Sequence, residues 1–346
     1  MKRALNIIVL CCLLYSCKLS NNSSVISLNF KDTTYVKPEI LKTEKILSVI
    51  WNVKILDSIL VLSSDDGTGF IQVFNKNNFK YLYTKGKYGR GPGEISNAGV
   101  EYKCIKDSIY IYDLVKSTLF IYDIKHFISD SLILKANNTI TFDSCKNNFD
   151  MMPLKGHFVS RSFSKARFAL FKRNGKYASN YSLFPDYYMT GDNPNLDLER
   201  RRYTHIEAKP DMSKFVCVSY IGGTIEIFNI VNDSINKLIE KNYLDPNLGK
   251  VENIKSLNQL ETKIGFCGLC ATDNYIYASY SGEASKDHRK KKSADFVIVF
   301  DWNGDPKKIY KVQGGLTGLA VDESQQKMYV ITKDPEGCSA IGLVKM

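Results

Sequence analysis

The chain has 346 residues, of which 12% are aromatic, and its formal net charge at pH 7 is +11. That length fits two average domains or a single all-β repeat domain. The near absence of helical periodicity argues against a mainly helical fold, and the excess of positive charge favours anionic surfaces or polyanionic glycans as partners, although it is also compatible with a role in solubility alone.

Residues 1–16 have the features of a bacterial export signal. Lys2 and Arg3 give a positive start, and Ala4 to Leu14 form a mostly apolar stretch of 11 residues. That stretch is too short to span a bilayer as a helix, which takes about 20 residues. The small residue before Cys17 resembles a bacterial lipobox, so we expect Cys17 to carry diacylglycerol. The alternative is an ordinary cleaved signal peptide that leaves a free thiol at Cys17.

The sequence after the signal divides into a tether and one large domain. Residues 17–29 are expected to form the lipid-anchored tether, because KLSNNSS at 18–24 is polar and flexible, and residues 30–346 a single domain. No other apolar stretch approaches membrane length, so contact with the membrane is expected through the acyl chains only. The expected location is the cell envelope of a Gram-negative bacterium, periplasmic or outer-membrane, where nucleic acid is not an expected partner.

A pair of short extended segments recurs along the chain. In the clearest copy, Ile109 to Tyr112 is followed, after a turn, by Leu119 to Tyr122. The first segments of the six pairs begin near residues 59, 109, 157, 215, 275 and 328, which gives a period of 48 to 60 residues. Each segment is rich in Ile, Val, Tyr and Phe and is bounded by turn-forming residues, as antiparallel strands are.

This period and composition predict an all-β fold, a six-bladed β-propeller of four-stranded antiparallel blades. The apolar segment from Leu47 to Leu56 is expected to sit against the last blade or to open the first, and so to close the ring. Asp192-Asn193-Pro194 and Asp245-Pro246 each place a cap and a proline at a helix start, which predicts short helical inserts between blades.

Six cysteines follow Cys17, at positions 104, 145, 217, 267, 270 and 338. Cys104 and Cys217 lie in strand-like segments, where a buried thiol behaves as a small apolar residue. Cys267 and Cys270 have CxxC spacing, which is compatible with core thiols, a local disulfide or metal ligation. A lone CxxC lacks the second pair of ligands that a structural zinc site needs.

The segment Lys85 to Glu94, KGKYGRGPGE, requires tight turns, because it holds four glycines around Pro92. A GxGxGPGE-like loop before the inner strand of a blade, behind an export signal, resembles the TolB-like six-bladed propeller lipoproteins of Bacteroidetes. The resemblance implies a propeller platform, usually without an assigned activity, that binds partners or ligands at the cell envelope. A strand follows the loop, so it is not expected to cradle phosphate as a helix-opening loop does.

Propeller topology places this loop and several basic segments on one face. Links between blades emerge on the same face as links from the second to the third strand, and these include segments 63–69, 176–205 and 283–293. We hypothesise that this face binds an anionic glycan or an envelope protein through Tyr88, Arg90, Glu94, Arg200, Arg201, Arg202, His288, Arg289, Lys290, Lys291 and Lys292. The alternatives are that the charge runs are solvated loops and that Arg90 and Glu94 only hold a structural turn.

No catalytic motif is found. The four histidines share no ligand spacing, and neither GxSxG nor HExxH occurs. We therefore predict no catalytic residue, metal or cofactor, and we expect the inner strands, as in segments 265–271 and 315–321, to present apolar and small residues to the channel. The predicted function is a non-catalytic binding or interaction platform. The alternative is a propeller enzyme, lactonase-like or a glycan hydrolase or lyase, with its site in the central channel.

Overall fold

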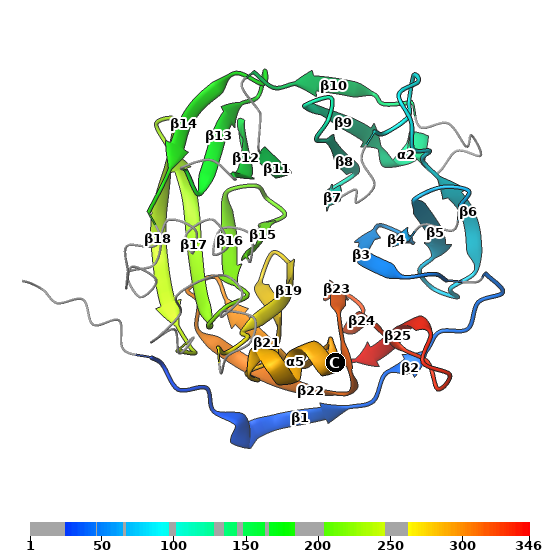
Figure 1. Cartoon of the computed structure of the whole chain (residues 1–346), viewed down its shortest axis with the longest axis vertical. Coiled ribbons are helices and arrows are strands. Elements are labelled where there is room, and N and C mark those ends of the chain that lie inside the picture. The colour runs from blue at the N-terminus through cyan, green and yellow to red at the C-terminus, as the bar shows by residue number, and fades with distance from the viewer. Residues whose placement is uncertain are drawn as a thin grey trace, which may run out of the picture.

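The computed structural model describes residues 25–45, 47–64, 67–96, 102–127, 135–143, 148–162, 166–183, 204–245 and 262–346. In this part of the chain the strands form six sheets that stand around a central axis like the blades of a fan (Figure 1). The predicted six-bladed propeller is therefore confirmed.

The blades follow one another along the chain, each with its first strand nearest the axis. The first three blades consist of β3 (Ile50–Leu56), β4 (Ile59–Ser64), β5 (Ile71–Asn75) and β6 (Tyr81–Lys85); β7 (Tyr102–Ile105), β8 (Ser108–Asp113), β9 (Thr118–Asp123) and β10 (Asn138–Thr141); and β11 (Asn148–Leu154), β12 (His157–Ser162), β13 (Phe168–Lys172) and β14 (Tyr177–Tyr181).

The remaining blades complete the ring. They consist of β15 (Thr204–Ala208), β16 (Lys214–Ser219), β17 (Thr224–Val231) and β18 (Ser234–Asn242); β19 (Phe266–Ala271), β20 (Tyr275–Tyr280), β21 (Ala294–Asp301) and β22 (Pro306–Leu316); and β23 (Gly318–Asp322), β24 (Lys327–Lys333) and β25 (Ser339–Lys345), whose fourth strand comes from the other end of the chain.

The six strand pairs predicted from the repeat are the second and third strands of the blades. In the second blade, Ile109 pairs with Tyr122 and Ile111 with Phe120. These central strands are apolar on both faces because each face of a blade packs against a neighbour, and every residue of β4 is buried. The apolar runs that revealed the repeat are therefore a direct consequence of two-sided burial.

The hydrophobic core lies between the blades. Ile50, Val53 and Leu60 of the first blade pack against Tyr329 and Ile341 of the sixth, and equivalent clusters fill the other junctions. Each sheet alone would leave both of its apolar faces in water, so the blades stabilise one another.

Buried polar contacts add specific links between neighbouring blades. The Arg167 guanidinium, beside the third blade, donates to Glu226 Oε1 on β17 of the fourth at 2.9 Å. Lys76 of the first blade forms an ion pair with Asp322 of the sixth at 2.8 Å. An unpaired buried charge is costly, so these contacts fix which blade faces meet.

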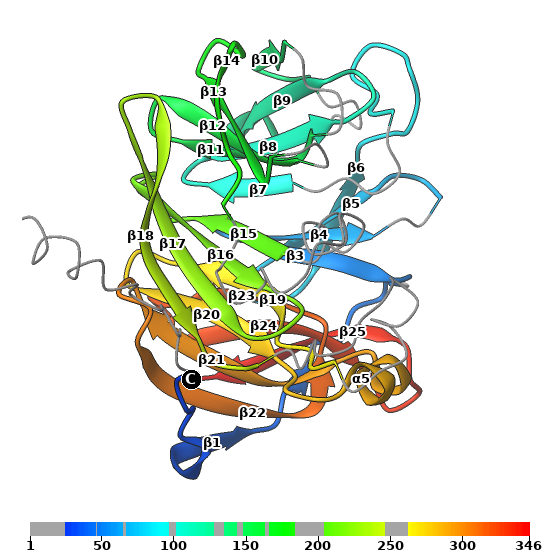
Figure 2. The same ribbon diagram turned by 60° about the vertical axis from the view of Figure 1, so that its left-hand side comes forward.

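An N-terminal strap closes the ring from outside. After a 3-10 turn, η1 (Phe30–Asp32), β1 (Thr33–Val36) adds a parallel fifth strand to β22, and β2 (Glu39–Ile40) pairs with β25 as the fourth strand of the sixth blade. Figures 1 and 2 show this blue segment along the outer edge of the last two blades. The segment from Leu47 to Leu56 was expected either to sit against the last blade or to open the first, and the structure shows that it opens the first blade as β3. The ring is closed instead by β2, residues 39 and 40, which lies before β3 in the chain.

The packed part of the chain begins before the expected start at residue 30. The amide of Ile26 donates to the carbonyl of Asn242 at 2.7 Å, and Leu28 is buried against the fourth and fifth blades. The expected signal, Cys17 and most of the tether lie outside the described residues.

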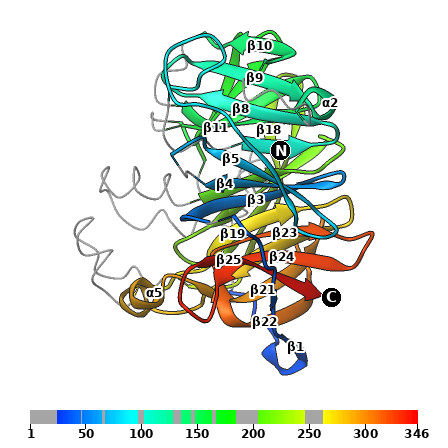
Figure 3. The ribbon, with the colours of Figure 1, turned by 90° about the vertical axis from the view of Figure 1, so that its right-hand side faces the viewer.

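Strand direction defines two faces of the ring. We call the upper face the one that carries the links between blades and those from second to third strands, and the lower face the opposite one. The link from β20 to β21 on the upper face contains α5 (Ser285–Lys291), at one edge of the ring in Figure 3, whereas α2 (Ile124–Phe127) lies on the lower face. Most residues of the two predicted helical inserts lie outside the described part of the chain. Among the described residues, no helix is long and apolar enough to cross a membrane.

The strap can be tested where it crosses β25. A Cβ added at Gly342 would lie 2.5 Å from the Cβ of Pro38, so we expect Gly342→Ala to loosen β2 and to destabilise the protein by about 1–3 kcal/mol through overpacking. Thermal unfolding measures this. The loss of stability caused by Gly342→Ala should be smaller in a Pro38→Gly background, where the opposing Cβ is absent. An unchanged melting temperature in Gly342→Ala alone would show that close packing of the strap on β25 does not contribute to stability.

Candidate functional site

The central channel is lined by the inner strands, and several of these carry a charged residue among apolar ones. Lys54 lies on β3, Lys103 on β7, Asp150 on β11 and Glu207 on β15, and all four are buried. The expectation of an apolar channel was therefore wrong for these blades. The signal was present in the sequence as a single charge inside each of the segments IWNVKIL, YKCI, NFDMMPL and THIEA.

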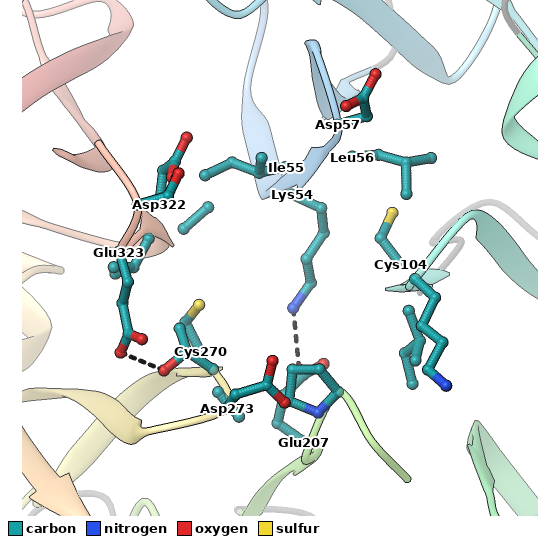
Figure 4. A pocket seen from close by; sticks show the side chains of 18 of the residues that line it. Lys54, Ile55, Leu56, Asp57, Cys104, Glu207, Cys270, Asp273, Asp322 and Glu323 are labelled. Atoms are coloured by element: carbon teal, nitrogen blue, oxygen red, sulfur yellow. Dashed lines mark hydrogen bonds and ion pairs between the residues drawn. The ribbon is translucent and has the colours of Figure 1, made fainter. Parts of the chain in front are cut away.

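One ion pair crosses the channel. Lys54 Nζ reaches from the first blade to Glu207 Oε2 on the fourth, at 2.9 Å, and Figure 4 shows its side chain extended across the opening. The first and fourth blades face each other across a six-membered ring (Figure 1), so this contact spans the axis. Lys103 Nζ lies 3.5 Å from the same carboxylate and donates to the carbonyl of Ile206 at 2.9 Å.

A second carboxylate extends this network toward the third blade. Asp150 pairs with Lys103 at 3.0 Å and with Arg161 Nε at 3.0 Å. The Arg161 guanidinium also lies over the Phe149 ring, 4.4 Å from its centroid. We call Lys54, Lys103, Asp150, Arg161 and Glu207 the charged waist. It contains three cations and two carboxylates, and Lys103, Asp150 and Arg161 have further contacts beyond these five residues.

The charged waist separates two cavities. The upper cavity, about 270 Å³, has the waist and otherwise neutral residues among its described lining. The lower cavity, about 700 Å³, has eight charged residues among its described lining: three lysines and five carboxylates, Lys54, Lys76, Lys106, Asp57, Glu207, Asp273, Asp322 and Glu323. Among the described lining residues of the lower cavity, carboxylates therefore outnumber amines.

Three inner strands have irregularities at the upper end of the channel. The pairing register shifts at Trp51 on β3, at Asp150 and Met151 on β11 and at Cys267 on β19. Trp51, Asp150 and Cys267 all line the upper cavity. Asp150 has a φ of +59°, a left-handed conformation that costs energy in a non-glycine residue. Bulges re-aim side chains and are common beside functional sites, so this cavity is the candidate site.

His205 on β15 lines the upper cavity and is half-buried. Burial, followed by the positive charge of Arg161, lowers the pKa of its imidazole to about 4. The ring is therefore neutral at physiological pH and has one donor and one acceptor nitrogen.

The described cysteines, 104, 217, 267, 270 and 338, are all free thiols. Cys267 and Cys270 do not form a disulfide; Cys270 is a buried core thiol as expected, whereas Cys267 is half-buried and lines the upper cavity. Cys267 Sγ lies 3.9 Å from His288 Nε2, and burial raises the pKa of the Cys267 thiol to about 12. A thiol with that pKa is a weak nucleophile near neutral pH. Within the described ranges no group of three or more His, Cys, Asp and Glu side chains is arranged to hold a metal ion.

The glycine-rich loop follows β6 on the upper face. Glu94 accepts a hydrogen bond from the amide of Gly91 at 2.8 Å, and the Tyr88 ring stacks on Phe70 at 4.8 Å. Gly86 has a φ of +78°, and a Cβ there would lie 2.4 Å from the Phe70 ring. Tyr88 and Glu94 therefore hold the loop in shape, whereas Arg90 is exposed.

The basic run at 288–292 lies on and just after α5. All four basic residues 289–292 are exposed; Lys291 pairs with Glu283 at 3.3 Å and also with Asp295, and Lys290 lies 4.0 Å from Asp287 in an exposed pair. His288 differs from its neighbours, because it is buried and its Nδ1 lies 3.1 Å from Ser281 Oγ. Burial lowers the pKa of His288, so this residue adds no charge to the surface near neutral pH. Arg200, Arg201 and Arg202 lie outside the described residues.

A comparison with known protein families identifies the family of this chain. The model of TolB-like six-bladed propellers matches residues 29–324. The chain belongs to this family. The resemblance predicted from the glycine-rich loop is thereby confirmed, and the match covers the first five blades of this TolB-like propeller together with β2 and β23 of the sixth. Among curated proteins, none matches the sequence.

Solved structures agree on the fold. A protein of Bacteroides fragilis that is described as exported has a TM-score of 0.55 and 13% identity, and the alignment covers 93% of this chain and 97% of that one. A member of the DUF4221 family from Bacteroides vulgatus has a TM-score of 0.59 and 10% identity, with 93% and 97% covered. At these identities the likeness establishes the propeller architecture alone.

The charged waist predicts a stability effect. Glu207→Gln removes the carboxylate that pairs with Lys54 and leaves Lys103 with Asp150, so we expect a loss of about 3–5 kcal/mol in urea unfolding, mainly from the buried Lys54 ammonium. Lys54→Met should lower the free energy of unfolding by less, because the Glu207 carboxylate would still have the Lys103 ammonium beside it. As a control, Lys172→Met breaks an exposed pair with Asp233 and should change stability little. If Glu207→Gln and Lys172→Met changed the free energy of unfolding equally, the buried ion pairs of the charged waist would not have the stabilising role assigned to them.

His205 predicts a pH dependence. Its folded pKa of about 4 lies below the ordinary pKa of 6.5 that it has in the unfolded chain, so the unfolded chain binds more protons between these values. The contribution of His205 to stability is therefore complete above about pH 6.5 and is lost as the pH falls toward about 4. Urea midpoints measured across this window should fall less steeply for His205→Gln than for the wild type, and parallel profiles would be inconsistent with a neutral, buried imidazole.

Proposed function

We propose that this TolB-like propeller is an exported, lipid-anchored and non-catalytic binding platform of the Gram-negative cell envelope, whose upper face takes an anionic ligand, an acidic glycan in the first place. The leader sequence with its lipobox-like Cys17 supports the location. The exported protein of Bacteroides fragilis with the same fold is consistent with it.

One observation carries the proposal: exposed basic side chains gather on the upper face, on α5 and just after it. These are Arg289, Lys290 and Lys292. The described lining of the lower cavity, in contrast, has more carboxylates than amines. An anion is therefore expected to be attracted to α5 and repelled from the lower cavity.

The channel chemistry favours binding over nucleophilic catalysis. Glu207 and Asp150 each form an ion pair with a lysine, so their oxygens are engaged within the protein. The raised pKa of Cys267 and its burial likewise favour a neutral thiol. These groups are suited to fixing the shape and charge of a binding cavity.

Charge reversal on α5 tests the proposal. The triple variant Arg289→Glu, Lys290→Glu and Lys292→Glu spares Lys291, whose ammonium holds Glu283 and Asp295. We expect about a tenfold or greater loss of affinity for heparin at low salt, since each reversed charge contributes a few tenths of a kcal/mol or more. The loss should diminish at high salt, because exposed charges are screened.

A matched control uses the opposite face. Lys106, Lys125 and Lys155 are exposed and lie in links on the lower face, so reversing these three charges changes the net charge equally. Heparin retention should stay near that of the wild type in this variant. Equal loss in both triple variants would show that only net charge matters, and unchanged retention of the α5 variant would contradict the proposed surface.

A further inference from the structure

We propose that Cys267 and His288 form a binding site for a soft monovalent metal ion, Cu⁺, at the edge of the upper cavity. The ion bonds to the sulfur of Cys267 and to Nε2 of His288, and Ser281 holds the imidazole in place. This site is separate from the exposed basic side chains on α5, so the inference goes beyond the proposed function and does not depend on it. It rests on the distance between the two donor atoms, the partners of the imidazole, access from the channel and the balance of charge.

Two local departures from the regular blade bring these residues together. In the pairing of β19 with β20 the register shifts across Cys267, which is the extra residue of a bulge. A bulge re-aims the side chain that it carries. His288 lies on α5, in the link that follows β20, and its side chain is buried although residues 289–292 are exposed. The two side chains therefore meet from different elements, 21 positions apart in the chain.

The distance between the donor atoms suits one bridging ion. Cys267 Sγ lies 3.9 Å from His288 Nε2. Zinc, the neighbour of copper, bonds to thiolate sulfur at about 2.3 Å and to imidazole nitrogen at about 2.0–2.1 Å, so the two bonds together reach roughly 4.3–4.4 Å. An ion between the two atoms can therefore bond to both, at a wide angle and with little movement of either side chain. The other contact of the sulfur is long as well, 3.8 Å to the carbonyl oxygen of Gly265.

The far side of the imidazole has the kind of partner that a metal-bound histidine needs. His288 Nδ1 lies 3.1 Å from Ser281 Oγ, which can accept its N–H and so leave the lone pair of Nε2 directed at the sulfur. The Tyr220 ring packs against the imidazole at a steep angle, with the centroids 5.8 Å apart, and limits its rotation. A ligand oriented in this way needs little ordering when the ion binds, which favours affinity.

An ion can reach this pair from the channel, because Cys267 is half-buried and lines the upper cavity. Cys270, three positions further along β19, lines the lower cavity on the other side of the charged waist. The CxxC spacing therefore does not bring its two thiols to one site. The second ligand of Cys267 is instead a histidine that the sequence presents as part of a basic run.

Charge balance favours a monovalent ion. Cu⁺ replaces the thiol proton, which passes to solvent, and the group of thiolate, neutral imidazole and Cu⁺ then has no net charge. A divalent ion on the same two ligands would leave a net positive charge, which is costly in a buried place. Thiolate sulfur is also a ligand that selects Cu⁺. Among the described residues, no third His, Cys, Asp or Glu is arranged to complete a larger site, which suits an ion of low coordination number.

Copper competition tests the site. Without oxygen, the purified protein is titrated with Cu⁺ held by bicinchoninate, a coloured chelator, and the loss of colour reports transfer of the ion to the protein. Cys267→Ser should bind one equivalent fewer than the wild type. Cys338→Ser, the matched control that removes an exposed thiol, should keep that equivalent. Equal uptake by the wild type and Cys267→Ser would show adventitious binding to other thiols and would overturn the inference.

Further variants separate ligation from a structural role. Ser281→Ala should weaken Cu⁺ binding by about 10–100-fold, the usual effect of removing the partner of a ligating histidine. His288→Gln should weaken it by more, because it removes a ligand. The triple charge reversal of Arg289, Lys290 and Lys292 should not weaken it, which distinguishes this site from the surface that is proposed to retain heparin. Circular dichroism and melting temperature of the metal-free proteins identify a variant that fails to fold.

X-ray absorption at the copper edge gives a measurement that needs no variant of the site itself. Copper-loaded Cys338→Ser protein should show one sulfur and one nitrogen bound to Cu⁺ at low coordination number. Two or more sulfur ligands would place the ion at other thiols. Zn²⁺ held as tightly as Cu⁺ in a chelator competition would contradict a site for a soft monovalent ion. Either of these last two results would overturn the inference, whatever the outcome of the heparin experiment.

Discussion

The fold of this protein depends on the burial of apolar side chains between neighbouring blades. A four-stranded sheet with two apolar faces is not stable alone in water, and each blade is covered only when both neighbours are present. The sixth blade is completed by β2 from the start of the chain, so the last junction forms only when residues far apart in sequence meet. The ring then presents the inner strands to a shared axis and fixes where their side chains meet.

The charged waist follows from that geometry. Lys54 and Glu207 are 153 positions apart, yet closure of the ring puts them on opposite sides of a narrow channel at contact distance. Because each charge is largely removed from water, each needs an opposite partner, and together they divide the channel. A closed ring thus obtains two cavities from one set of inner strands. The bulges at Trp51 and Cys267 place these two residues in the lining of the upper cavity.

The architecture could be predicted from sequence because its cause is local and repeated. Runs such as Ile109 to Tyr112 are apolar on both strand faces, and their spacing counts the blades. The waist could not be predicted in the same way: a lysine within YKCI indicates an unusual strand but does not name Glu207 or Asp150 as its partners. The register shift that exposes Trp51 has no signal in the sequence, and His288 reads as part of a basic run although its side chain is turned inward.

The course of the strap has a mechanical consequence. The chain comes onto the ring at its circumference, near Ile26 and Asn242, and runs along the outermost strands before it enters the first blade. A force applied to this end along the strap loads the four residue pairs of β1 and β22 in shear, so the hydrogen bonds between these strands resist it together. The inner strands would carry none of that force until the strap had come away, so tension at the rim leaves the axial cavities undeformed.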